Sequence, residues 1–208
     1  MVKIKICGIT NVTDAVWAAN LGVDYIGLVF AKESPRKVSL KMAREIAAAI
    51  PPYIAKAGVF VNEEAAVVEK TLAACGLNLL QFHGDESVEY CNGFKGRAKV
   101  IKAFRISSQE SLENIPRYDT DFYLLDTFVE DIPGGSGQSF NWDFAVQAKE
   151  FGRPLFLAGG MNAGNVVQAV KKVNPYAVDV SSGVESSPRR KNVELMREFV
   201  SRVRALKI

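Results

Sequence analysis

The sequence predicts an α/β fold in which eight parallel strands and the helices between them form a closed (β/α)8 (TIM) barrel. Eight β-rich runs begin at residues 3, 24, 55, 78, 99, 121, 154 and 176, and most of them start about 22 residues after the run before. Helix-like segments fill the intervals, and there is no second compositional region, linker or low-complexity stretch. Eight such units fit a closed barrel better than an open doubly wound sheet. We therefore expect residues 1–208 to form a single barrel domain.

The predicted strands are short and rich in apolar and β-branched residues. The runs YIGLVF, FYLLD and PLFLA are almost continuously apolar, which is typical of parallel strands that are covered on both faces. The eight predicted strands are Lys3–Cys7, Asp24–Phe30, Ala55–Val61, Asn78–Phe82, Lys99–Arg105, Asp121–Asp126, Pro154–Ala158 and Tyr176–Val180.

The segments between the strands are predicted to be amphipathic helices throughout. One helix is expected over Asp14–Leu21 with Thr13 as its N-cap, and another over Leu40–Ile50 with Ser39 as its N-cap and Pro51 as its stop. All residues that follow strands gather at one end of a barrel, and the active sites of this fold lie there.

Two connections after strands are about ten residues longer than the others. They are Ala31–Val38 and Thr127–Ser139. Their extra length lies at the end of the barrel where chemistry is expected.

Composition excludes several classes of protein. The chain is 48% hydrophobic, so it is not intrinsically disordered. Its 26 basic and 23 acidic residues give a net charge of +3 without a basic stripe, which argues against nucleic acid and membrane surfaces as partners. Its one histidine, His83, excludes metal sites that need two imidazoles.

Three cysteines, at positions 7, 75 and 91, form neither a disulfide framework nor a zinc motif. The first residues, MVKIKICGIT, alternate polar and apolar side chains instead of forming the apolar run of a signal peptide, and no stretch is long and apolar enough to span a membrane. We therefore expect a cytoplasmic protein, in which Cys75 and Cys91 are packing residues.

Cys7 ends the first predicted strand, at a position where barrels carry functional groups. The two-residue period of a strand places Lys3, Lys5 and Cys7 on one face. If the isoleucines on the other face pack against helices, Cys7 faces the mouth of the barrel and Lys5 lies inside it. A buried ammonium needs a carboxylate, and we expect Asp179 on the neighbouring eighth strand to provide it. The alternative is that Cys7 is an inert buried thiol.

Asp126 ends the sixth predicted strand after four apolar or aromatic residues. It is either a cap of the following loop or helix, or a carboxyl held at the mouth of the barrel. A thiol and a carboxyl on well-separated strands of one rim can flank a small substrate and act as base and acid without a metal or cofactor.

The loops after strands seven and eight, LAGGMN and VDVSSGVE, predict a phosphate site, because barrels of this class usually bind phosphate there. A short helix that begins near Val184 is expected to point its amide groups at the anion. The alternative is that glycine and serine only make tight turns. The candidate phosphate ligands are Gly159, Gly160, Ser181, Ser182 and Gly183.

Three further features lie on loops that follow strands. Arg36 follows a stiffening Ser-Pro pair and suits a planar carboxylate. His83 lies at the rim and either contacts substrate or has a structural role. Gly134–Gly137 is either a mobile lid or a plain flexible loop.

The motifs together resemble those of the phosphoribosylanthranilate isomerase family of tryptophan biosynthesis. The resemblance runs from Lys3 to Glu185, and only Ser136 and Met161 depart from residues that are usual in the family. The motifs are KICGIT, SPRKV, QFHG, LLDT, GGSGQSFNW, LAGGMNAGNV and VDVSSGVE, in the order of the family.

The resemblance implies a cofactor-free Amadori rearrangement of N-(5'-phosphoribosyl)anthranilate. Cys7 would be the general base and Asp126 the general acid, Arg36 would hold the anthranilate carboxylate, and the last two loops would hold the phosphate. Asp126 must then be protonated and Cys7 ionised, the reverse of free side chains, whose pKa values are about 3.9 and about 8.5. Cationic neighbours such as Lys5 would lower the pKa of the thiol, whereas an apolar mouth would raise that of the carboxyl.

Alternative functions remain open from the sequence. The histidine-pathway isomerase runs the same rearrangement with two aspartates, whereas this chain has Cys7. A metal-dependent ribulose-phosphate epimerase is disfavoured by the single histidine, and the catalytic lysine and glutamate of indole-glycerol-phosphate synthase have no match. A non-catalytic sensor of a phosphorylated ligand would not need the acid and the base. Both a monomer and a homodimer are compatible with the sequence.

Overall fold

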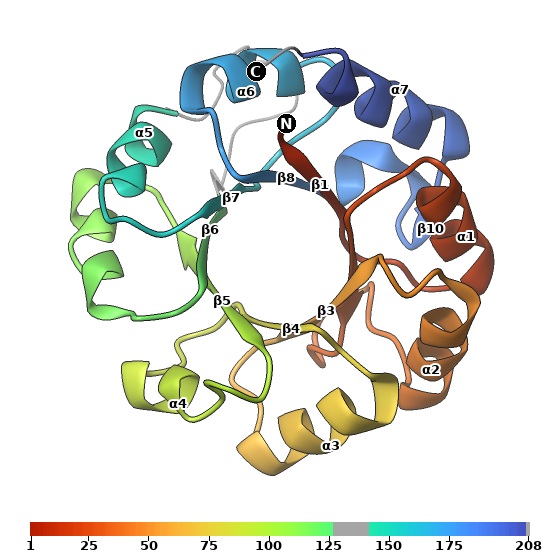
Figure 1. The fold of residues 1–208 in the computed structure, drawn as a ribbon, viewed down its shortest axis with the longest axis horizontal. Coiled ribbons are helices and arrows are strands. Elements are labelled where there is room, and N and C mark those ends of the chain that lie inside the picture. The colour runs from red at the N-terminus through yellow and green to blue at the C-terminus, as the bar shows by residue number, and fades with distance from the viewer. Residues whose placement is uncertain (127–141, 207–208) are drawn as a thin grey trace.

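Eight parallel strands form a closed ring in the computed structural model, which describes residues 1–126 and 142–206. Each strand pairs with the next one along the chain, and β8 pairs with β1 (Figure 1). The predicted barrel is therefore confirmed. The strands are β1 (Lys3–Ile6), β2 (Tyr25–Val29), β3 (Ala55–Phe60), β4 (Leu79–Phe82), β5 (Lys99–Arg105), β6 (Phe122–Asp126), β7 (Leu155–Leu157) and β8 (Ala177–Val180).

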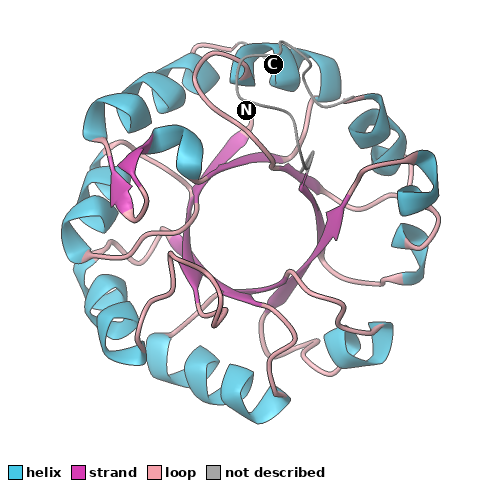
Figure 2. Ribbon diagram, turned by 180° about the vertical axis from the view of Figure 1, so that it is seen from behind, coloured by secondary structure: helices cyan, strands magenta, loops and turns pink. Residues whose placement is uncertain are grey.

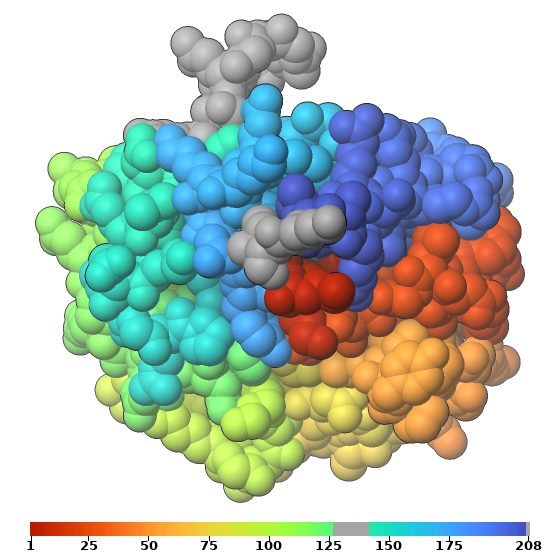
Figure 3. Space-filling model, turned by 45° about the horizontal axis from the view of Figure 1, so that its top comes forward, coloured from red at the N-terminus to blue at the C-terminus, as the bar shows by residue number. Residues whose placement is uncertain are grey.

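Helices surround this ring on the outside (Figure 1). The last helix returns to the start of the chain. There Arg204 donates hydrogen bonds to the Val2 and Gly22 carbonyl oxygens and to the Asp24 carboxylate. Figure 3 shows the last part of the described chain, in dark blue, next to its first residues, in red. No helix within the described ranges is long and apolar enough to cross a membrane. The α-helices are α1 (Val12–Asn20), α2 (Leu40–Ala49), α3 (Ala65–Cys75), α4 (Val88–Asn92), α5 (Asp143–Lys149), α6 (Val166–Val173) and α7 (Val193–Arg204).

Two expectations about helices are wrong. The N-cap of α1 is Asn11 and not Thr13, because the Asn11 side chain accepts a hydrogen bond from the Asp14 amide at 2.8 Å and the helix begins two residues earlier. The connection between β5 and β6 holds two 3-10 turns, Gln109–Leu112 and Ile115–Arg117, instead of an α-helix. Pro116 lacks the amide hydrogen that an α-helix through this segment needs. The predicted Ser39 cap is confirmed.

The apolar core has two parts, one on each side of the strand ring. Ile4 and Ile6 point outwards and pack in the large cluster that lies between the strands and the helices. Inside the ring a smaller cluster, which includes Tyr25, Leu124 and Phe156, fills the lower part of the barrel. The prediction for β1 is therefore confirmed, because its isoleucines pack against the helices whereas Lys5 and the following Cys7 lie on the inner side of the ring.

Lys5 and Asp179 form a buried ion pair inside the ring. The Lys5 Nζ atom lies 2.6 Å from the Asp179 Oδ2 atom, and the side chains are 0% and 6% exposed. Burial is the largest single effect and lowers the pKa of Lys5, but the charges of Asp179 and Cys7 and their hydrogen bonds with Lys5 together outweigh burial and raise the pKa. The predicted pair is confirmed, and Lys5 is a fixed positive charge below Cys7.

We expect Lys5→Met to lower the free energy of unfolding by about 3–5 kcal/mol at neutral pH, because it leaves the Asp179 carboxylate buried without its cation. Burial raises the pKa of Asp179, so the folded variant binds a proton more readily than the unfolded chain, and part of the lost stability returns as the pH falls. Urea unfolding at several pH values measures both effects.

Lys3→Met is the matched control, because Lys3 pairs with Asp24 at 2.8 Å on the surface and its side chain is 46% exposed. The control should lose less than about 1 kcal/mol. Equal losses in the two variants would show that the buried pair contributes nothing special to stability.

Candidate active site

Cys7 follows β1 directly and lies at the carboxyl end of the barrel. Its amide donates a hydrogen bond to the Val180 carbonyl oxygen at 2.8 Å, and its side chain packs with Val29 and Val59. A Cβ atom at Gly27 of β2 would lie 2.6 Å from the Cys7 Sγ atom, so only glycine leaves room for the thiol. Sequence reasoning missed Gly27, although an isolated glycine inside a strand is a signal of close approach.

Burial controls the protonation of Cys7. It raises the pKa of the thiol, and together with the negative charge of Asp179 it outweighs the positive charges of Lys5 and Lys191, which lower that pKa. The surroundings of Cys7 therefore do not provide the lowered pKa that the family resemblance implies, and they favour the thiol over the thiolate.

Asp126 ends β6, and its Oδ2 atom lies 3.0 Å from the Nε2 atom of His83. His83 follows β4, and its Nδ1 atom lies 3.0 Å from the Nε2 atom of Gln81. Both Asp126 and His83 are partly exposed at the mouth of the barrel. The structure therefore brings the His83 side chain into contact with Asp126, the candidate acid. The sequence predicted only that the two residues lie on the same rim.

Arg36 lies beside Gly8, the residue after Cys7, and its side chain already binds a carboxylate. Its Nε and Nη2 atoms donate to the two carboxylate oxygens of Glu185 at 2.8 and 2.6 Å. A Cβ atom at Gly8 would touch both the Arg36 and the Ser181 side chains, so the ends of β1 and β8 and the loop after β2 meet here. The Arg36 Nη1 atom donates to no group in residues 1–126 or 142–206.

A short hairpin after β8 fastens this side of the mouth. Its strands, β9 (Glu185–Ser187) and β10 (Arg190–Lys191), lie outside the main ring (Figure 2). The Lys191 Nζ atom donates to Glu185 at 2.9 Å and to the Ser181 carbonyl oxygen at 3.0 Å. Arg189 also donates to the Pro35 carbonyl oxygen at 2.9 Å.

The hairpin corrects the prediction of a helix that begins near Val184. A 3-10 turn, Ser182–Val184, ends there, and the chain then continues as β9. The sequence did not predict the hairpin or the roles of Glu185 and Lys191, because strands of two or three residues show no hydrophobic period.

The two glycine-rich loops adjoin each other. Gly159 and Gly160 both adopt the left-handed backbone region, with φ of 78° and 63°. The side-chain amides of Asn162 and Asn165 donate to the Gly160 carbonyl oxygen at 3.1 and 2.9 Å. A Cβ atom at Gly183 would collide with the Met161 carbonyl oxygen, so the loops after β7 and β8 are in direct contact. The predicted phosphate-binding residues thus lie together, whereas Gly134–Gly137 lies outside the described residues.

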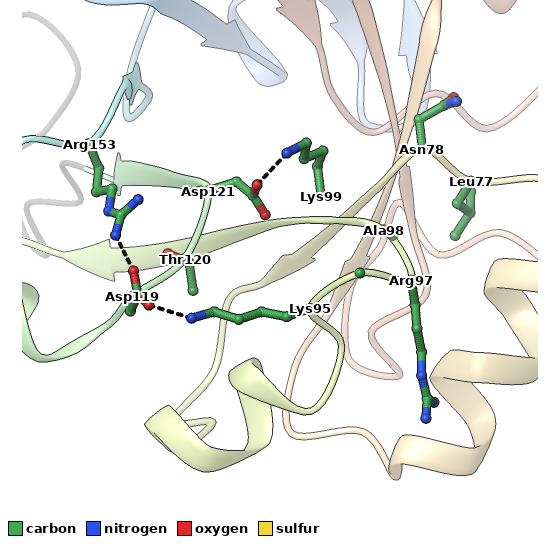
Figure 4. A pocket seen from close by; sticks show the side chains of 11 residues that line it. Leu77, Asn78, Lys95, Arg97, Ala98, Lys99, Asp119, Thr120, Asp121 and Arg153 are labelled. Carbon is green, nitrogen blue, oxygen red and sulfur yellow. Dashed lines mark hydrogen bonds and ion pairs between the residues drawn. The ribbon is translucent and has the colours of Figure 1, made fainter.

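A cleft of about 820 Å³ lies at the opposite end of the barrel, where β4 to β7 begin (Figure 4). Asp119 contacts both Lys95 and Arg153 there, and Asp121 pairs with Lys99. None of the predicted site residues lines this cleft. Because barrel active sites lie at the carboxyl ends of the strands, the candidate site is the mouth around Cys7 and Asp126.

Fold and site define a (β/α)8-barrel protein with a thiol, Cys7, and a carboxyl, Asp126, at the carboxyl ends of β1 and β6. Residues 4–202 match the family described as N-(5'phosphoribosyl)anthranilate (PRA) isomerase. The N-(5'-phosphoribosyl)anthranilate isomerase of Geobacter metallireducens is 48% identical over 99% of this chain and 100% of its own length. The chain therefore belongs to the PRA isomerase family, and the resemblance found in the sequence is confirmed.

Solved structures agree with this assignment. The phosphoribosyl anthranilate isomerase of Thermotoga maritima superposes with a TM-score of 0.93 at 39% identity, covering 99% of this chain and 100% of that one. A phosphoribosyl anthranilate isomerase in complex with reduced 1-(o-carboxyphenylamino)-1-deoxyribulose 5-phosphate superposes with a TM-score of 0.90 at 37% identity, with the same coverage.

We expect the rate of alkylation of Cys7 to rise with pH only above the ordinary pKa range of a cysteine thiol, because burial raises the pKa of this thiol. The measurement is site-resolved mass spectrometry after brief treatment with iodoacetamide over a range of pH. Cys91 is the internal control, since burial raises its pKa to about 12. Rapid alkylation of Cys7 at neutral pH would contradict the assignment of a resting thiol.

Proposed function

We propose that this protein converts N-(5'-phosphoribosyl)anthranilate into 1-(2-carboxyphenylamino)-1-deoxyribulose 5-phosphate in tryptophan biosynthesis. The observation that carries the proposal is the placement of one thiol and one carboxyl, Cys7 and Asp126, at the carboxyl ends of separate strands around one mouth. Membership of the PRA isomerase family supports the same reaction. The rearrangement moves hydrogen within one molecule, so it consumes no cofactor.

In the proposed mechanism Asp126 donates a proton to the ring oxygen of the ribose, and the bond between that oxygen and C1' breaks. The nitrogen lone pair forms the C1'–N double bond of an iminium ion. The Cys7 thiolate then removes the proton from C2', which gives an enolamine that tautomerises to the ketone. Each turnover leaves Cys7 protonated and Asp126 ionised, so one proton must return from the base to the acid.

Other side chains would hold the substrate. The Arg36 Nη1 atom and the second hydrogen of Nη2 can bind the anthranilate carboxylate while Glu185 keeps its two hydrogen bonds. The backbone and hydroxyl groups of Gly159, Gly160 and Ser181–Gly183 would bind the phosphate, since their two loops are in contact at the same mouth. We place the protein in the cytoplasm, where its three free cysteines stay reduced.

We expect Cys7→Ser and Asp126→Asn each to lower kcat by about 10²–10⁴-fold, because each removes one partner of the acid–base pair. The assay follows loss of substrate fluorescence, with phosphoribosylanthranilate generated in situ from anthranilate and phosphoribosyl pyrophosphate. Cys75→Ser is the control, since Cys75 lies at the end of α3. Retained turnover in Cys7→Ser would refute the thiolate base.

Absence of turnover in the native protein would overturn the proposed reaction. The histidine-pathway aminoaldose would then be the next substrate to test. Saturable binding of a phosphorylated ligand without any turnover would instead favour a sensor.

We expect Arg36→Lys to raise KM by about 10–100-fold with a smaller effect on kcat, because an ammonium cannot serve Glu185 and a second carboxylate with a planar array of donors. Arg44→Lys on the exposed face of α2 is the matched control. Steady-state kinetics with the same assay measure both variants. An unchanged KM in Arg36→Lys would exclude Arg36 as the carboxylate ligand.

A further inference from the structure

The side chain of Gln81 on β4 is a buried amide inside the barrel, two residues before His83, which follows the strand. The neighbouring β4 residues Leu80 and Phe82 pack in the outer core, so Gln81 shares the inner face with Leu79. Its side chain is almost fully buried, at 1% exposure. An amide in this position needs a polar partner, and among residues 1–126 and 142–206 the side chain that meets it is His83.

The contact with Gln81 determines which nitrogen of His83 carries hydrogen. The Gln81 Nε2 atom can only donate, and it lies 3.0 Å from His83 Nδ1, so Nδ1 acts as the acceptor. In the neutral imidazole the hydrogen is then on Nε2, which lies 3.0 Å from the Asp126 Oδ2 atom. The three side chains form a directed chain of hydrogen bonds that ends on the candidate acid.

The other end of the amide is unsatisfied. The Gln81 Oε1 atom is buried and accepts no hydrogen bond from the described part of the chain. If the amide were turned over, its oxygen would face Nδ1 and select the opposite tautomer, and Asp126 would then face a lone pair. The observed orientation leaves a buried carbonyl oxygen without a donor but gives His83 the hydrogen that Asp126 can use.

We propose that Gln81 is a positioning residue that holds His83 in the Nε2–H tautomer and so provides Asp126 with a hydrogen-bond donor. The donor stabilises the carboxylate that forms when Asp126 gives up its proton. The wrong tautomer would present a lone pair to that carboxylate and oppose the same step. Asp179 also acts on this side of the mouth, through its electrostatic interaction with Asp126 and His83.

The tautomer can be observed directly, because His83 is the only histidine in the chain. In protein labelled with ¹⁵N-histidine, at about pH 9, where an ordinary imidazole is neutral, Nδ1 should give the shift of an acceptor nitrogen and Nε2 that of a protonated one. Gln81→Leu should change this to a mixture of tautomers. Gln81→Glu, whose carboxylate can only accept, should reverse it.

Two spectra would overturn the proposal. One is a wild-type spectrum with the hydrogen on Nδ1, and the other is an unchanged spectrum in Gln81→Leu. If either variant fails to fold, the wild-type spectrum alone still decides the tautomer. This measurement does not depend on catalysis.

The catalytic consequence rests on the proposed function and is tested by a double-mutant cycle. Gln81→Leu should lower kcat about tenfold or more with little change in KM, and it should cause no further loss in a His83→Ala background. Thr71→Val removes a different buried polar group, the hydroxyl that donates to the Val67 carbonyl oxygen on α3, and controls for loss of a buried polar group in general. Equal losses in both backgrounds would show that Gln81 acts through packing. Absence of turnover in the native protein would refute the proposed function but leave the tautomer assignment to the spectra.

Discussion

The pairing of β8 with β1 is the constraint on which the rest of the structure depends. Four residue pairs, from Lys3 with Ala177 to Ile6 with Val180, close the ring. A shift of one residue in this register would turn the inner face of β1 outwards. The same register sets Lys5 beside Asp179, so the ion pair and the closure of the ring support each other. Closure of a parallel ring also brings the carboxyl ends of all eight strands to one mouth.

The inside of the barrel changes character along its axis. At the lower end aromatic side chains such as Phe122 and Phe156 pack edge to face. Above them lies a layer of polar groups, Lys5, Asp179 and Gln81, each of which is nearly or fully buried. Polar groups are costly in such a place unless they are paired, but their interactions are also strong there, because water is excluded. This layer supports the mouth and places fixed charges and donors directly beneath Cys7 and His83.

The sequence predicted the parts of this arrangement that depend on short periods. The strand that was predicted over Asn78–Phe82 is observed over Leu79–Phe82, because an apolar run between turn residues is a local signal. The pair of Lys5 with Asp179 could also be inferred, because the order of strands in a closed barrel makes the first and the last neighbours. Both predictions needed only the alternation of side chains and the topology.

Other parts of the site could not be predicted, because they join residues that share no pattern. Glu185 meets Arg36 across 149 positions of sequence, through a hairpin whose strands are too short to show a period. The contact of His83 with Asp126 depends on the rotamers of two rim residues on strands that are not neighbours. In the sequence, Gln81 is a single polar residue in an apolar strand. Only the distance between its Nε2 atom and His83 Nδ1 shows which group it contacts.

The proposed chemistry places opposite demands on the two sides of the mouth. A free cysteine and a free aspartate in water would need about 6 kcal/mol to exchange one proton, given reference pKa values that differ by about 4.6 units. Because the exchange only moves a proton from thiol to carboxylate, the net charge of the site is the same before and after it. Overall attraction or repulsion of an anionic substrate therefore cannot drive the exchange, and local differences between the two sides must do so.

On the side of β1 and β8, burial favours the thiol, so the thiolate depends on the positive charges of Lys5 and Lys191. On the side of β4 and β6, the donor that we propose on His83 Nε2 would favour the carboxylate and so assist release of the proton from Asp126. A donor that assists release also opposes reloading of Asp126. Within the proposed mechanism, the proton that leaves Cys7 is thus the natural source of the proton that Asp126 needs. Ionisation of Cys7 and protonation of Asp126 must therefore occur together before each turnover.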